Sequence, residues 1–176
     1  KETTKKDPTR WKTKVGTADI SQTRFFVRMP GDSMRIGGFL SEAKIKKGNF
    51  NLENGDYRAG YLEILESALN YDIPQARYSK GLDTNHLALT GLNLGADTLH
   101  YYNGRLSVGI PLFAATEKCG LTVNNLHGLV TLDSTHLTLP MFHMHTPYTE
   151  LDATANVNWK ALRAGKGGLM NFNVQG

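Results

Sequence analysis

Hydrophobic and polar residues alternate around Asn103-Gly104 with the period of two that β-strands require. The alternating hydrophobic residues are Leu99 and Tyr101 before this dipeptide and Leu106, Val108, Ile110 and Leu112 after it. Asn and Gly tolerate the positive φ that both central positions of a type I′ turn need. The stretch therefore predicts a β-hairpin that turns at Asn103-Gly104.

A second alternating run covers residues 150–159, ELDATANVNW. Its hydrophobic positions are Leu151, Ala153, Ala155, Val157 and Trp159, and its polar positions are Asp152, Thr154, Asn156 and Asn158. Successive side chains of a strand point to opposite faces, so this run predicts a strand with one dry and one wet face.

Shorter segments repeat the pattern elsewhere. Between the two runs the hydrophobic pairs are Leu121 and Val123, Val130 and Leu132, and Leu137 and Leu139. Upstream, Leu87 and Leu89 are followed by Leu92 and Leu94 after Gly91, and this change from odd to even positions predicts a bulge or turn at the glycine. Residues 24–29 and 44–57 are also strand-like, with a further turn expected at Asn54-Gly55. The sequence therefore predicts a mostly β fold: an antiparallel, twisted or curved sheet of many short strands with little helix.

Residues 61–71, YLEILESALNY, fit a helical stripe as well as a strand. No capping residue stands before Tyr61, Gly60 occupies the entry, and the neighbouring segments are strand-like. We favour a long bulged strand, and we expect Pro74 to end it.

Two histidines one residue apart, His143 and His145, lie in the segment LTLPMFHMHTPYTEL. An uninterrupted strand would place both imidazoles on the side of Leu137 and Leu139. A one-residue bulge near Pro140 instead moves Phe142 and Met144 to the leucine face and turns both histidines outward. The alternative is a metal site with His127, His136 or His100 as a third ligand, but no zinc signature is present. We predict no metal site.

The length and the charge distribution of the chain predict how it is divided into segments. The chain of 176 residues fits one domain, and its 18 glycines, which follow no period, indicate many turns. The net charge is +4, and much of the positive charge lies in the opening stretch KETTKKDPTRWKTK, which lacks the interleaved aromatic residues of nucleic-acid sites. We expect a flexible basic segment over residues 1–23, a single β-rich domain over residues 24–176, and no nucleic-acid partner.

Cys119 is the single cysteine, which excludes a disulfide framework and a cysteine-based zinc motif. No apolar run approaches the roughly 20 residues needed to span a bilayer, and no secretory signal is visible. The chain begins at Lys1 rather than Met. We therefore expect a piece of a larger protein whose membrane anchor or signal lies outside it.

Two stretches resemble catalytic motifs but lack residues that those motifs require. Ala164-Gly165-Lys166-Gly167-Gly168 lacks the first glycine of a phosphate loop, at Lys160, and has no Ser or Thr after Lys166. Gly31-Asp32-Ser33-Met34-Arg35 fails the nucleophile-elbow pattern at Arg35. We predict that the chain is not an enzyme and needs no cofactor.

From about Gly38 onward the chain resembles the AsmA-like family, and within it the TamB-like members of the Bacteroidetes type. The stretches that carry the resemblance are Tyr71-Asp72-Ile73-Pro74, the box from Gly81 to Leu87, and the segment from Leu137-Thr138-Leu139-Pro140 to Thr146-Pro147-Tyr148-Thr149-Glu150-Leu151. Family members more often have Pro at the position of Thr84. The family has no active-site motif to transfer.

The resemblance implies a segment of a long periplasmic protein, anchored in the inner membrane through a part absent from this chain, with strands stacked into a taco-shaped or half-barrel groove that is apolar inside. It further implies a role in outer-membrane biogenesis and in phospholipid transport between membranes, with an outer-membrane assembly partner of the Omp85 type. Phospholipid acyl chains are then the expected ligand. The expected groove or core residues are Leu87, Leu89, Leu92, Leu94, Leu99, Tyr101, Leu106, Val108, Ile110, Leu112, Leu121, Val123, Val130, Leu132, Leu137, Leu139, Phe142, Met144, Leu151, Val157 and Trp159.

Two other classes of function stay open at this point. Turn-rich strands with aromatic residues are also found in surface or periplasmic β-sandwich modules that bind glycans or proteins. A zinc hydrolase built on His143 and His145 is the enzymatic alternative.

Overall fold

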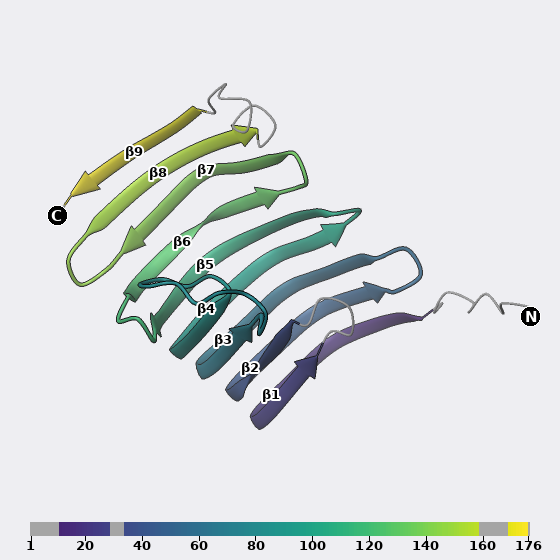
Figure 1. The fold of residues 1–176 in the computed structure, drawn as a ribbon. Helices are drawn as coiled ribbons and strands as arrows, with labels where there is room; N and C mark the ends of the chain where they lie inside the picture. The colour runs from purple at the N-terminus through teal and green to yellow at the C-terminus, as the bar shows by residue number, and fades with distance from the viewer. Residues whose placement is uncertain (1–10, 29–33, 159–168, 176) are drawn as a thin grey trace, which may run out of the picture.

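A computed structural model of the chain describes residues 11–28, 34–158 and 169–175, which form β-strands, turns and loops but no helix. Its strands are β1 (Lys12–Arg28), β2 (Arg35–Asn51), β3 (Asp56–Asp72), β4 (His86–Tyr102), β5 (Arg105–Glu117), β6 (Thr122–Leu132), β7 (His136–His145), β8 (Glu150–Asn158) and β9 (Leu169–Gln175). They form one antiparallel sheet in chain order, as Figure 1 shows from β1 at one edge to β9 at the other. This confirms the predicted mostly β fold, an antiparallel sheet with little helix.

The sheet is a single open layer. Each described strand pairs with its neighbours in sequence, so β1 and β9 lie at opposite edges and do not meet. All described strands belong to this sheet, so no second sheet or helix among the described residues covers either face. The aliphatic residues therefore line the surface of one layer rather than the interior of a sandwich.

The first four strands have 17 residues each, and so are longer than the short strands expected from the sequence. The reason is that several predicted segments are parts of one strand. Leu87 and Leu89, Leu92 and Leu94, and Leu99 and Tyr101 all belong to β4. Bulges interrupt the alternation inside a strand without ending it.

Gly91 marks one of these interruptions. It has a φ of +57°, and the register between β4 and β5 shifts between Thr90 and Asn93. The shift brings Leu89 and Leu92 to the same face, which confirms the bulge predicted at the glycine. In β3, Glu66 has a φ of +45° and the register to β4 shifts beside it. Residues 61–71 are therefore a bulged strand rather than a helix, and β3 ends two residues before Pro74.

The bulge near Pro140 is also confirmed. The register between β7 and β8 shifts between Leu139 and Phe142. As a result Phe142 lies opposite Ala153 and Met144 opposite Leu151, while His143 lies opposite Asp152. The two hydrophobic residues join the face of Leu139, and His143 and His145 are turned to the other face.

The predicted turns form as expected. Asn103 and Gly104 have φ values of +50° and +74°, which is the pair of positive angles that a type I′ turn needs. Gly55, in the turn between β2 and β3, has a φ of +68°. Both hairpins therefore turn at the Asn-Gly dipeptides that were predicted from the sequence.

Two predictions are corrected. Residues 12–23, expected in a flexible segment, form the first part of β1, so the boundary placed at residue 24 moves to Lys12. Leu112 lies on the opposite face from Leu106 and Val108, because the register shifts between Ile110 and Phe113. Pro111 sits at this shift, where a residue without an N–H fits best. Phe113 takes the place expected for Leu112.

Some of the sequence predictions fall outside the described residues. These are Trp159, the glycine-rich stretch 164–168, most of the stretch 31–35, and residues 1–10.

Gly104 and Gly16 both have open space where a Cβ atom would lie. Substituting each with alanine therefore measures the effect of backbone conformation without that of steric overlap. A Cβ added at Gly104 or at Gly16 meets no atom within 4 Å, but only Gly104 has a positive φ. We expect Gly104→Ala to lower the free energy of unfolding by about 1–2 kcal/mol. Gly16→Ala should leave it unchanged or raise it by up to about 1 kcal/mol. Urea denaturation of both variants checks this, and equal losses would contradict the turn assignment.

The turn between β6 and β7 should lose stability in acid. Asp133 Oδ1 accepts hydrogen bonds from the Thr135 hydroxyl and from the backbone N–H groups of Thr135 and His136, each at 2.7 Å. These bonds lower the pKa of Asp133 from 3.8 to about 2. Since the folded-state pKa is the lower one, the contribution is complete above pH 3.8 and disappears as the pH falls towards 2. The stability difference between the wild type and Asp133→Ala, measured by urea denaturation, should shrink over this pH range. A difference that stays constant would show that the ionised carboxylate is not the stabilising group.

Candidate functional site

One row of hydrophobic residues crosses eight of the nine strands without interruption. Residues directly opposite each other in a sheet point to the same face. The row consists of Ile20, Ala43, Ile64, Leu94, Phe113, Leu126, Met144 and Leu151, each directly opposite the next. At a strand spacing of about 4.8 Å the row is roughly 34 Å long. We call the face that carries it the apolar face.

A second row runs parallel to the first on the same face. It consists of Phe50, Tyr57, Tyr101, Leu106, Leu132, Leu137 and Val157, again each opposite the next, from β2 to β8. Tyr57 and Tyr101 stack with their ring centroids 5.9 Å apart. The apolar face is therefore a band several residues wide rather than a single line.

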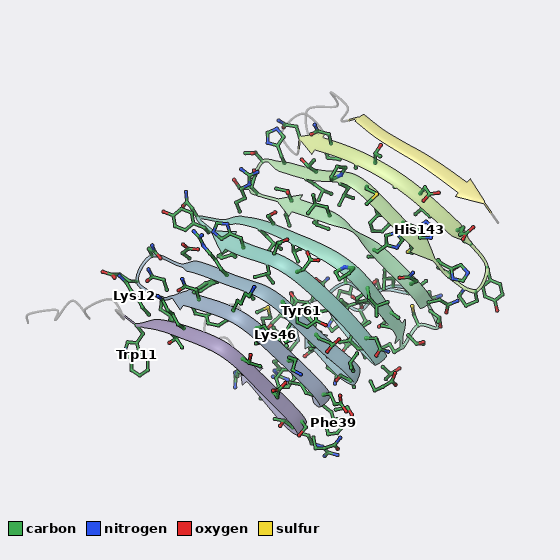
Figure 2. The ribbon with its side chains drawn as sticks, turned by 180° about the vertical axis from the view of Figure 1, so that it is seen from behind. Trp11, Lys12, Phe39, Lys46, Tyr61 and His143 are labelled. Atoms are coloured by element: carbon green, nitrogen blue, oxygen red, sulfur yellow. The ribbon has the colours of Figure 1, made fainter. Side chains whose placement is uncertain are left out.

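The opposite face, here called the polar face, has its own continuous row. Its members are Lys14, Asn49, Arg58, His100, Ser107, Thr131, Thr138 and Asn156. The same face carries Lys46, whose ammonium lies 5.2 Å from the Tyr61 ring centroid, and His143; Figure 2 labels all three. The polar face also carries the exposed hydrophobic residues Leu112, Leu129 and Met141, but it has no hydrophobic row that matches those of the apolar face.

Most of the predicted groove residues lie on the apolar face in a half-buried state. Leu92, Val108 and Val157 are buried, with 3%, 8% and 2% exposed. Tyr101, Leu121 and Leu132 are exposed at 38–41%. The half-buried residues are Leu87, Leu89, Leu94, Leu99, Leu106, Ile110, Val123, Val130, Leu137, Leu139, Phe142, Met144 and Leu151. The side chains of the apolar face therefore contact one another within the face, while part of their surface remains accessible.

The residues that β1, β2 and β3 contribute to the apolar face were not predicted from the sequence. Ile20, Ala43 and Ile64 begin the eight-strand row, and none of them was a candidate. The alternation of Ala43 and Ile45 with Lys44 and Lys46 was the available signal.

The apolar face contains a cavity of about 230 Å³ beside the start of β4. It is lined by Leu82, Thr84, Leu87, Leu89, Phe113, Ala115, Glu117, Leu121 and Val123. Leu82 and Thr84 come from the loop 73–85, which connects β3 to β4 and is drawn in dark teal across the lower part of the sheet in Figure 1. The loop therefore closes one side of the cavity.

Asp83 holds this loop in place. Its carboxylate accepts hydrogen bonds from the backbone N–H groups of Ser79 at 2.9 Å and Asn85 at 3.1 Å, and it lies 3.0 Å from His86 Nδ1. The bond from Ser79 is the main cause that lowers the pKa of Asp83. His86 is 2% exposed and stacks on Tyr78 with ring centroids 3.8 Å apart. These groups fix the loop and face away from free solvent.

Glu117, at the end of β5, is the one charged residue that lines the cavity. It is 3% exposed, and its carboxylate accepts hydrogen bonds from the backbone N–H groups of Ala88 at 3.1 Å and Cys119 at 2.6 Å. Hydrogen bonds from the side chain and backbone of Cys119 lower the pKa of Glu117. The carboxylate thus holds the start of β4 and the turn after β5 through these hydrogen bonds.

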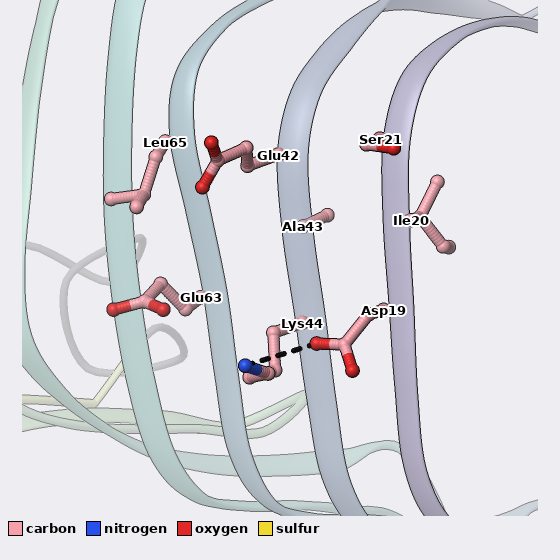
Figure 3. A pocket seen from close by; sticks show the side chains of 8 residues that line it. All are labelled: Asp19, Ile20, Ser21, Glu42, Ala43, Lys44, Glu63 and Leu65. Carbon is pink, nitrogen blue, oxygen red and sulfur yellow. Dashed lines mark ion pairs between the residues drawn. The ribbon is translucent and has the colours of Figure 1, made fainter.

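A second cavity, of about 220 Å³, lies over β1, β2 and β3 (Figure 3). Its lining includes Asp19, Glu42, Lys44 and Glu63, with the Lys44 ammonium 3.0 Å from Asp19. The hydrogen bond to Asp19 raises the pKa of Lys44. The residues that line this cavity include no histidine or cysteine and form no recognisable nucleophile–base pair.

The histidines considered as metal ligands from the sequence lie on β4, β6 and β7. His127 lies directly opposite His143, whereas His145 lies opposite Asn125. His100 is bonded to Asp56 at 3.0 Å, and His136 lies 2.8 Å from the Thr135 hydroxyl. Within the described ranges no group of three His, Cys, Asp or Glu side chains converges on a point that could hold a metal ion.

The described part of the chain contains no helix that is long and apolar enough to cross a membrane. Comparison with protein-family models, with curated proteins and with solved structures finds no match to this chain.

Proposed function

We propose that this chain is a non-catalytic segment of an AsmA-like envelope protein and that its apolar face binds the acyl chains of phospholipids. The observation that carries the proposal is the hydrophobic row from Ile20 to Leu151, which is uninterrupted over eight strands and is not covered by a second layer of described residues. An antiparallel sheet with an apolar face needs a partner for that face. Acyl chains provide such a partner.

The energetics favour a ligand that slides along the face. Burial of each methylene group contributes about 0.8 kcal/mol, so a chain of some fifteen carbons gains on the order of 10 kcal/mol relative to water. The members of the row are all aliphatic or aromatic, so this gain is similar at each strand. Two cavities, lined in part by Ile20, Ala43 and Phe113, interrupt this uniformity, and a ligand meets the open face along the rest of the row.

The chemistry of the charged residues supports a non-catalytic role. The buried carboxylates of Asp83 and Glu117 accept hydrogen bonds from backbone N–H groups, which identifies them as loop anchors. The remaining charged groups that form ion pairs lie mostly on exposed side chains.

The resemblance of residues 38 onward to the AsmA-like family supports the cellular setting of the proposal. In this setting the sheet contributes one wall of a longer apolar groove in the periplasm, anchored in the inner membrane by another part of the protein. Its role is phospholipid transport between membranes during outer-membrane biogenesis, with an Omp85-type protein as outer-membrane partner.

A pair of adjacent residues on opposite faces of β6 tests lipid binding. Val130 lies opposite Val108 on the apolar face, and Thr131 lies opposite Ser107 on the polar face. We expect phospholipid to co-purify with the wild type and to be detected by mass spectrometry of an organic extract. Val130→Asp should lower the lipid recovered per protein at least fivefold, because it places a charge in the acyl-chain path.

Thr131→Asp is the matched control, since it adds the same charge one residue away on the other face. It should leave lipid recovery within a factor of two of the wild type. Circular dichroism establishes that both variants keep the sheet. Equal lipid recovery from the two variants, or no lipid in the wild type, would contradict binding on the apolar face.

Photo-crosslinking tests whether lipid contacts the face along its whole length. A benzophenone amino acid at Ile20, Leu94 or Leu151 samples three points of the eight-strand row. Each should capture phospholipid in cells, whereas the same probe at Lys14 or Thr138 on the polar face should not. Capture only beside the cavity of loop 73–85 would indicate a single binding pocket and would rule out movement along the row.

A further inference from the structure

Two histidines meet across neighbouring strands on the polar face. His127 on β6 lies directly opposite His143 on β7, and their ring centroids are 4.9 Å apart with the planes tilted by 33°. The register of β6 and β7 therefore holds two imidazoles close enough together to bind one ligand.

Asp152 on β8 determines which nitrogen of His143 is free. Its Oδ1 lies 2.8 Å from His143 Nδ1. An ionised carboxylate can only accept a hydrogen bond, so Nδ1 carries the proton and Nε2 of the neutral ring keeps its lone pair. Histidines that bind a metal through one ring nitrogen commonly donate the N–H of the other nitrogen to a carboxylate, which fixes the orientation of the ring.

A second observation comes from Asn125, two residues before His127 and therefore on the same face of β6. Its Oδ1 is buried and has no hydrogen-bond partner among the described residues. Asn125 lies directly opposite His145, beside the histidine pair. An unsatisfied buried oxygen in a native structure calls for a bound water molecule or ion.

We propose that His127 and His143 bind a divalent first-row transition-metal ion between β6 and β7, with Asp152 as a positioning residue and Asn125 Oδ1 as a candidate further ligand. Imidazole is a preferred ligand of copper, nickel and zinc, and the order of affinities places Cu²⁺ highest. Metal–nitrogen distances of about 2.0–2.1 Å require the two coordinating nitrogens to lie roughly 3–4 Å apart. Rings whose centroids are 4.9 Å apart reach this separation by side-chain rotation.

The pair differs from the one that the sequence suggested. His143 and His145 lie on one strand two residues apart, which separates their Cα atoms by roughly 6.6 Å. His127 and His143 are instead direct cross-strand neighbours, which is the closer arrangement. The site lies on the polar face, so it is independent of the proposed lipid-binding role.

Titration of the tag-free full chain with CuCl₂ tests this proposal, by calorimetry and by electron paramagnetic resonance. We expect one strongly bound ion per chain and a spectrum with two coordinated imidazole nitrogens. His127→Gln and His143→Gln should each lower the affinity at least tenfold. Asp152→Asn should lower it about tenfold while the two-nitrogen spectrum is retained, because the residue orients a ligand without being one.

Two histidines on the same face serve as controls. His100 is also bonded to a carboxylate, that of Asp56, but lies opposite Arg58 and Ser107 rather than a histidine. His100→Gln and His145→Gln should leave the Cu²⁺ affinity within a factor of two. A tenfold loss in either control, or unchanged affinity in His127→Gln and His143→Gln, would overturn the proposal. Circular dichroism of every variant confirms that the sheet is retained.

Discussion

Direct opposition of residues across antiparallel strands is the constraint on which the separation of the two faces depends. A slip of one residue moves every following side chain of a strand to the other face. The row from Ile20 to Leu151 consists of directly paired residues, and the bulges at Glu66, Gly91 and Pro140 keep hydrophobic residues farther along the same strands on its face. The bulges therefore maintain the apolar face, although each one locally disrupts the ladder of hydrogen bonds.

This separation of faces connects the fold to both proposals. The apolar face offers the same kind of surface at each strand, which suits a ligand recognised by its methylene groups rather than by a specific contact. The polar face carries the hydrogen-bonding and charged residues, where neighbouring strands bring His127, His143 and Asp152 into one line. A single layer can perform two unrelated tasks because the side chains of each strand alternate between its two sides.

Much of the fold could be predicted at positions where the residue type itself indicates the backbone conformation. Asn103-Gly104, Gly91 and Pro140 each disclosed a turn or bulge, because glycine and proline have distinctive conformational limits. The positive φ angles of Gln22, Lys47 and Glu66 had no such marker. Residues 24–29, 44–57 and 61–71 were predicted as strands, but the share of β1, β2 and β3 in the apolar face was missed. Leu112 was misplaced because the bulge beside Pro111 became visible only from the pairing with β6. Similarly, the meeting of His127 with His143 depends on register, which a single sequence does not specify.

The strand order β1 to β9 also determines how the protein folds. Every strand pairs with the strands next to it in the chain, so the residue pairs beside each turn close only a short loop and the pairs farther along the two strands can follow them. Sheets dominated by distant pairings fold slowly, whereas this meander can grow outward from any hairpin, and the Asn103-Gly104 hairpin supplies a preformed start near its middle. The same order makes stability nearly a sum over neighbouring strands, so the sheet opens from its edges while the central strands remain paired.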